Sequence, residues 1–174
     1  MKPIITNNVA VALSFFIFLS FYPLLNATKY SDMVNEICPS VNNTKLCSET
    51  LKNDLPDDIG ASDSFIVRFV NIAKGNATEV SASIDKSIGS GGEGSEDLLA
   101  LEKCQVDIRS AVQELGAAAG LVSYKEYTKA RNHVADAKKF SHLCVKKLQP
   151  NTKLYGSVKT ITELCEIVDA VLKI

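Results

Sequence analysis

The chain has 174 residues, with 19 basic and 20 acidic side chains and a net charge of −1 at neutral pH. This balance shows no excess of positive charge, so we expect no nucleic-acid partner. The length fits one domain with an adequate core.

The N-terminal segment has the layout of a secretory signal peptide. Lys2 precedes a polar run, an apolar stretch spans residues 9–25, and the segment closes at Ala27. This order is typical of a cleaved signal, whereas an apolar stretch interrupted by Pro23 is at the short limit for a membrane anchor. We therefore expect residues 1–27 to be removed, leaving residues 28–174 as one secreted, extracellular domain that does not contact a membrane.

All five cysteines follow this segment, and in an oxidising compartment disulfides are their expected state. The chain has no CxxC pair and no matching His and Cys spacing, so we expect neither a metal site nor a cofactor. Five cysteines leave one unpaired. Their positions are Cys38, Cys47, Cys104, Cys144 and Cys165.

The first two predicted helices form a hairpin. One spans about residues 31–38 and ends at Pro39, and the next spans about residues 44–54 and ends before Pro56. Its turn contains Asn42, in an Asn-Asn-Thr sequon. A second sequon, Asn-Ala-Thr at Asn76, falls in the next helix, and both are candidate glycosylation sites.

Four longer helices follow. The first begins near Ser62, and the glycine-rich residues 89–97 that end it predict a flexible connection rather than a phosphate loop, because no strand precedes them and no Lys-Ser or Lys-Thr follows. Ser95 is the expected N-cap of the next helix. "SYKE", residues 123–126, is interpreted as a capping box that starts the third, Pro150 ends that helix, and the fourth spans about residues 152–173.

Apolar residues recur every three or four positions along each of these helices, which predicts one packing seam per helix. The seams are Phe65, Phe69, Ala73, Ala77, Val80 and Ile84; Leu101, Cys104, Ile108, Ala111, Leu115 and Ala118; Tyr127, Ala130, Val134, Ala137, Ser141, Cys144 and Leu148; and Leu154, Val158, Ile161, Cys165, Val168 and Leu172.

The predicted fold is all-α: an up-and-down four-helix bundle (residues 61–174) preceded by a helical hairpin (residues 28–60), with two disulfides. Cys38 and Cys47 flank the hairpin turn, and Cys104 and Cys144 lie on the seams of consecutive antiparallel helices, so these are the expected pairs. Cys165 remains as a buried free thiol. We expect a monomer.

No catalytic set is apparent. His133 and His142 are nine residues apart on one predicted helix, so they lie on opposite faces and cannot easily share a substrate or a metal. Carboxylates such as Asp107 and Glu114 have the spacing of a polar helix surface. The chain is therefore not expected to be an enzyme, and its function is expected to be binding.

Several motifs together resemble the plant invertase/pectin methylesterase inhibitor family. They are the secretory signal, "EICPSVNNTKLCSETLKND" with its cysteine pair, "LALEKCQVDIRSAVQELGAA", the helix bearing Cys144 and the last helix "ITELCEIVDAVLKI". The resemblance implies a hairpin leading a four-helix bundle, the same two disulfides, and stoichiometric, non-covalent inhibition of a plant cell-wall or vacuolar carbohydrate enzyme. The protein itself is expected in the apoplast or cell wall.

Pectin methylesterase is favoured over invertase as the target. "LCEIV" around Cys165 resembles the esterase-inhibitor branch, and the Pro-Lys-Phe element expected in the invertase branch is replaced by "SYKEY". Two regions depart from the family pattern: Ile108 stands where a tyrosine is usual, and "HLCVKKL" surrounds Cys144.

The resemblance places the contact with the enzyme on the two central helices, and we predict that their residues pointing away from the seams cover the substrate cleft. A secreted bundle that binds another wall component and a hydrolase using His133 and His142 are the alternatives. The predicted partner-binding residues are Asp107, Ser110, Glu114, Lys125, Lys129, Asn132 and Asp136.

Overall fold

The structure is a computed structural model that describes residues 34–54, 62–91, 98–150 and 152–173. The expected signal segment, Ser95 and the end of the linker before Ser62 lie outside these ranges. Among the described residues, no helix is both long enough and apolar enough to cross a membrane.

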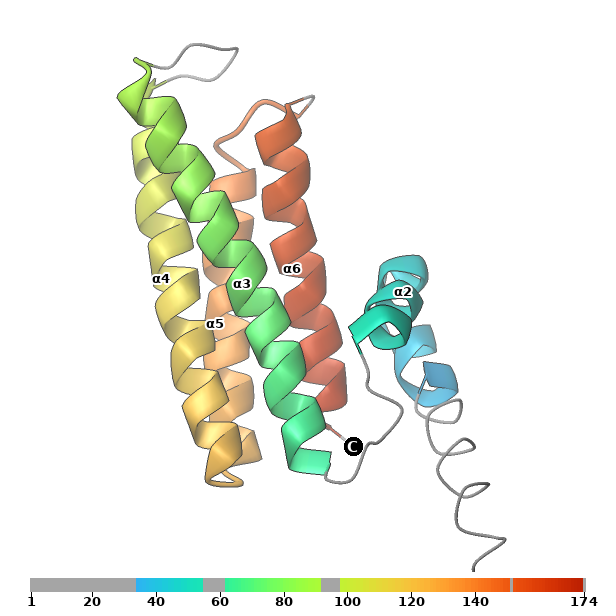
Figure 1. The fold of residues 1–174 in the computed structure, drawn as a ribbon. Helices are drawn as coiled ribbons and strands as arrows, with labels where there is room; N and C mark the ends of the chain where they lie inside the picture. Colours follow the sequence, from blue (N-terminus) through green and yellow to red (C-terminus); the bar gives the residue numbers. More distant parts are fainter. Residues whose placement is uncertain (1–33, 55–61, 92–97, 151, 174) are drawn as a thin grey trace, which may run out of the picture.

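Four long helices form the predicted bundle (Figure 1). They are α3 (Ser62–Gly89), α4 (Leu98–Ser123), α5 (Tyr127–Val145) and α6 (Lys153–Val171). Helix α3 packs against α4, α4 against α5 and α5 against α6, and α6 closes the ring by packing against α3. The bundle predicted from the seams is therefore confirmed.

The seam positions form the core. Every predicted seam residue is buried except Tyr127 and Leu154, which are half-buried at helix ends. Alanines such as Ala73, Ala111 and Ala137 stand among larger side chains along the seams. The small residues let neighbouring helices approach closely while the larger side chains fill the space between them.

The N-terminal hairpin lies beside α6 (Figure 1). Helix α2 (Thr44–Asp54) has the predicted bounds. The first helix does not end before Pro39 as predicted, because a 3-10 turn, η1 (Cys38–Ser40), continues it through the proline. Proline is tolerated there since the first turn of a helix does not need its N–H.

The turn between α4 and α5 differs from the predicted capping box. Ser123 is the last residue of α4, and its hydroxyl donates to the Ala119 carbonyl. The N–H groups of Lys125 and Glu126 donate back to the carbonyls of Val122 and Leu121. Lys125 has a φ of 61°, so this is a Schellman ending in which a lysine takes the left-handed position usual for glycine.

Candidate partner-binding face

The seven predicted partner-binding residues lie on α4, α5 and the turn between them. We call their shared surface the α4–α5 face. Four are exposed and three are partly buried: the exposed ones are Lys125, Lys129, Asn132 and Asp136, and the partly buried ones are Asp107, Ser110 and Glu114. The structure thus brings the predicted set to one side of the bundle, but it divides the set by accessibility.

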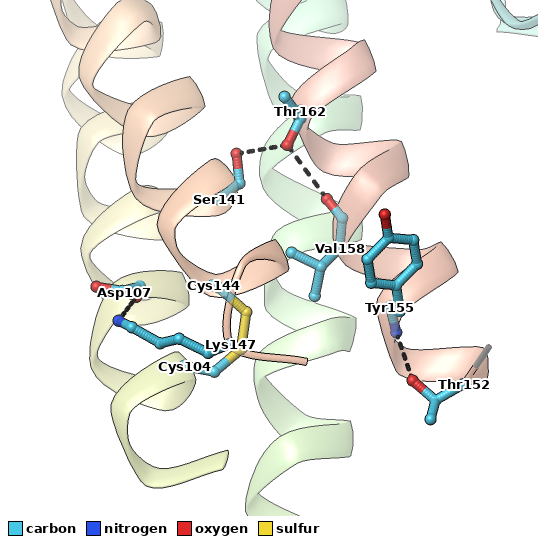
Figure 2. The surroundings of a disulfide bond; sticks show 9 residues. All are labelled: Cys104, Asp107, Ser141, Cys144, Lys147, Thr152, Tyr155, Val158 and Thr162. Atoms are coloured by element: carbon cyan, nitrogen blue, oxygen red, sulfur yellow. Dashed lines mark hydrogen bonds and ion pairs between the residues drawn. A yellow bond between two sulfur atoms is a disulfide. The ribbon is translucent and has the colours of Figure 1, made fainter. Parts of the chain in front are cut away.

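Asp107 is not the solvent-facing residue that was predicted. Its carboxylate forms an ion pair with the Lys147 ammonium beside the Cys104–Cys144 disulfide (Figure 2). The Asp107 side chain is only 13% exposed and that of Lys147 31%. Lys147 is therefore also not a freely solvated charge, since it joins the end of α5 to α4.

Glu114 is also engaged between the two helices. Its Oε2 atom lies 2.5 Å from Nδ1 of His133 on α5, and the Glu114 side chain is 29% exposed. Glu114, like Asp107, is therefore not a simple solvent-facing position, and changing both residues to lysine would disturb the fold. Such a change would break two contacts that hold α4 against α5, so it cannot test partner binding alone.

The outer part of the face carries accessible polar groups. Lys129 forms an ion pair with Glu126 three residues earlier, and Asn132 and Asp136 follow on the exposed side of α5. Exposed ion pairs contribute little to stability. These side chains are consequently available for a partner at small cost to the fold.

The two departures from the family pattern differ in how deeply their side chains are buried. Ile108, at the position where tyrosine is usual, is fully buried in the core and cannot touch a partner in this fold. His142 and Lys146, beside Cys144, are exposed. Only the second departure can change the surface presented to another protein.

The structure contains both disulfides, Cys38–Cys47 and Cys104–Cys144, with Cα atoms 5.5 and 4.4 Å apart. The first closes the hairpin, and the second ties α4 to α5. Cys165 is a free, buried thiol on α6. Burial raises the pKa of this thiol to about 12, so it stays protonated and unreactive at neutral pH.

A polar contact between the hairpin and α6 was not predicted. The Asn43 side chain accepts from the Leu46 N–H, which caps α2, and its amide donates to Glu163 at 2.9 Å. The amide of Asn42 donates to Glu166 at 2.9 Å. The sequence does show asparagines before Thr44 and two glutamates three positions apart in the last helix. Neither pattern indicates that these residues contact each other.

Two grooves border this contact. One of about 700 Å³ lies between the hairpin and the helices α5 and α6, and the second, of about 450 Å³, continues along α5 and α6. Ion pairs cross the first groove, with Arg131 bound to Asp169 at 3.0 Å and Lys138 to Glu166 at 2.8 Å. Lys138 thus links α5 to α6.

These carboxylates give the fold an acid-sensitive contact. Burial raises the pKa of Glu166, but hydrogen bonds from Lys138 and Asn42 lower it by more, so it lies below the ordinary 4.5. For Asp169, burial is likewise outweighed by Lys173 and Arg131, and its pKa lies below 3.8. A carboxyl with a lowered folded-state pKa stabilises the fold above its unfolded pKa, and this contribution disappears as pH falls through the folded value.

We therefore expect the melting temperature to fall steeply below about pH 4.5, with Glu166 contributing part of the fall. Glu166→Gln should lower the melting temperature at neutral pH and make it less sensitive to acid than in the parent. Thermal unfolding followed by circular dichroism across this range measures both effects. Glu79→Gln, on the exposed side of α3, is the control, and equal acid sensitivity in all three proteins would contradict the assignment.

The described part of the chain contains no cluster of side chains suited to binding a metal ion, and it does not bring the two histidines together. No group of three or more His, Cys, Asp or Glu side chains there could hold a metal ion. His133 lies against α4 at Glu114, while His142 borders the groove beside α6. The two histidines thus face different neighbours, as their spacing predicts.

The described part of the chain is a four-helix bundle led by a disulfide-closed hairpin, with polar side chains on the α4–α5 face. The family described as plant invertase/pectin methylesterase inhibitor matches residues 32–171. The match covers most of the chain, and the protein therefore belongs to this family, whose members are inhibitors.

Two solved structures share the fold. One is a mutant form of a pectin methylesterase inhibitor from Arabidopsis, with a TM-score of 0.70 and 18% identity, covering 81% of this chain and 95% of the other. The second is a pectin methylesterase inhibitor from Arabidopsis thaliana, with a TM-score of 0.59 and 19% identity, covering 83% and 95%. A search of curated proteins found no match.

Proposed function

We propose that the protein is secreted and inhibits a plant pectin methylesterase through a non-covalent, stoichiometric complex in which the α4–α5 face covers the substrate cleft. Family membership supports inhibition as the activity. The two structural neighbours described as pectin methylesterase inhibitors favour the esterase over invertase as the target.

The observation that carries the proposal is the rigid pairing of α4 and α5. A disulfide, the Asp107–Lys147 ion pair and the Glu114–His133 contact hold these helices together. A preorganised surface loses little conformational freedom when it binds. Lys129, Asn132 and Asp136 remain exposed beside these contacts, where they can match charges on a partner and set specificity.

A titration of the purified mature protein against several pectin methylesterases and invertases tests the proposal. We expect saturation at one inhibitor per esterase, with activity recovered on dissociation because no covalent bond forms. Inhibition of invertases alone would assign the other target of the family. An absence of inhibition across the panel would indicate a bundle that binds something else.

The contact surface is tested by the double variant Lys129→Glu/Asp136→Lys, which reverses two exposed charges and leaves the core and the Asp107 and Glu114 contacts intact. We expect inhibition to weaken by about tenfold or more, equivalent to about 1.4 kcal/mol of binding energy, at an unchanged melting temperature. Glu79→Lys on α3 is the matched control. If the double variant inhibits as well as the parent, the contact lies elsewhere, and the hairpin turn around residues 41–45 becomes the next candidate.

A further inference from the structure

Two of the three sequons lie among the described residues, and their surroundings in the folded chain differ; the third, at Asn26, falls within the expected signal segment. Asn42 is exposed in the bend before α2 and borders both grooves beside the hairpin. Asn76 is half-buried in the middle of α3, and its amide donates to the Ile72 carbonyl at 3.1 Å. A bulky, polar glycan needs an open surface position, which Asn42 offers and Asn76 does not.

The amide of Asn42 can carry a sugar without leaving its partner. Its nitrogen has two hydrogens, and one bond, to Glu166, is made in the fold. Transfer of an oligosaccharide from a lipid pyrophosphate donor would form a bond between this nitrogen and the anomeric carbon. The nitrogen loses one proton, the lipid pyrophosphate leaves, and the second N–H stays available to Glu166.

The grooves on either side of Asn42 offer polar contacts to such a glycan. Lys138, Glu166 and Asp169 border the larger groove, and Lys159 and Glu163 the smaller one. Sugar hydroxyls both donate and accept hydrogen bonds, so they can contact charged groups of either sign. The ring of Tyr155, half-buried at the smaller groove, adds an apolar surface.

We propose that Asn42 carries an N-linked oligosaccharide that lies along these two grooves, and that Asn76 remains unmodified. The glycan then shields the side of the bundle formed by the hairpin, α5 and α6. It leaves the α4–α5 face open, because Asp107 and Glu114 meet α5 on the side of that helix away from the α6 contacts of Arg131 and Lys138.

Site occupancy can be measured on the full chain expressed through the secretory pathway of plant cells. Intact mass and glycopeptide mapping, before and after enzymatic glycan removal, would compare the parent with Thr44→Ala, Thr44→Ser and Thr78→Ala. These variants remove the Asn42 sequon, preserve it, and remove the Asn76 sequon, and they leave both asparagines in place. We expect one glycan in every protein except Thr44→Ala, which should have none.

A glycan found on Asn76, or an unmodified Asn42 in the secreted parent, would overturn the site assignment.

The position of the glycan is tested by acetylation of lysines in Thr44→Ser and Thr44→Ala. Lys138 and Lys159 should react several-fold more slowly in the glycosylated protein, while the exposed Lys103 on α4 reacts equally in both. Equal rates at all three would show that the glycan lies away from the grooves. Neither readout uses esterase inhibition, so this inference and the proposed function can fail separately.

Discussion

Replacing Cys104 and Cys144 by alanine is expected to lower the free energy of unfolding by about 4 kcal/mol, the chain-entropy value for the loop that their bridge closes. The two cysteines are 40 residues apart in sequence and both are fully buried. Replacing Cys38 and Cys47, only nine residues apart, should lower it by about 2.7 kcal/mol. Guanidinium unfolding of the two double variants measures the difference.

The structure adds a second reason for this order. The Cys104–Cys144 bridge ties two core helices beside the Asp107–Lys147 ion pair (Figure 2), whereas Cys38–Cys47 closes a hairpin beside the bundle. Cys165→Ala removes a buried sulfur without opening a bridge and serves as the control. A larger loss from the hairpin pair than from the bundle pair would show that the hairpin, not the α4–α5 pair, dominates the stability.

The substitution Phe69→Ala is expected to lower the free energy of unfolding by about 3 to 5 kcal/mol. Phe69 is among the largest fully buried side chains of the bundle, and its ring centroid lies 4.8 Å from that of Phe65 in a tilted arrangement. Alanine would lose both this ring contact and the burial of the aromatic surface, and it would leave a cavity on the seam of α3.

Phe69→Leu is the matched control for this prediction, because it keeps most of the apolar volume and should cost less than about 1.5 kcal/mol. Unfolding in denaturant gives both values on one scale. If alanine and leucine had the same small effect, the seam of α3 would be able to collapse around the smaller side chain, and Phe69 would not be central to the core.

The helices and their core faces could be predicted because that information is local. The spacing of Phe65, Phe69 and Ile84 identifies the buried side of α3 without reference to any other helix. Pro56 and the glycines after residue 88 give end signals in the same way. Four such helices with short connections leave few ways to bury their seams, so the bundle follows from periodicity alone.

The solvent exposure of the residues on the α4–α5 face could not be predicted from the spacing of apolar residues within a single helix. A helical wheel shows that Asp107 and Glu114 lie off the seam of α4, but it does not show that the same side meets Lys147 and His133 of α5. That depends on how the two helices are rotated against each other. The Schellman turn at Lys125 could not be predicted either, because the residue in the left-handed conformation is a lysine, whereas the usual sequence signal is glycine.

The contact of the hairpin with α6 has a consequence for biosynthesis. The bonds from Asn42 to Glu166 and from Asn43 to Glu163 join residues 124 and 120 positions apart. Most other helix contacts in the bundle join consecutive elements and can form as the chain emerges from the ribosome. The hairpin is translated before the bundle, but the surface it docks on, α6, is translated after the other described helices. Until the C-terminal helix has left the ribosome, Ile37 and Val41, which are buried in the finished protein, lack that docking surface. This interval is when the new chain most needs protection against aggregation.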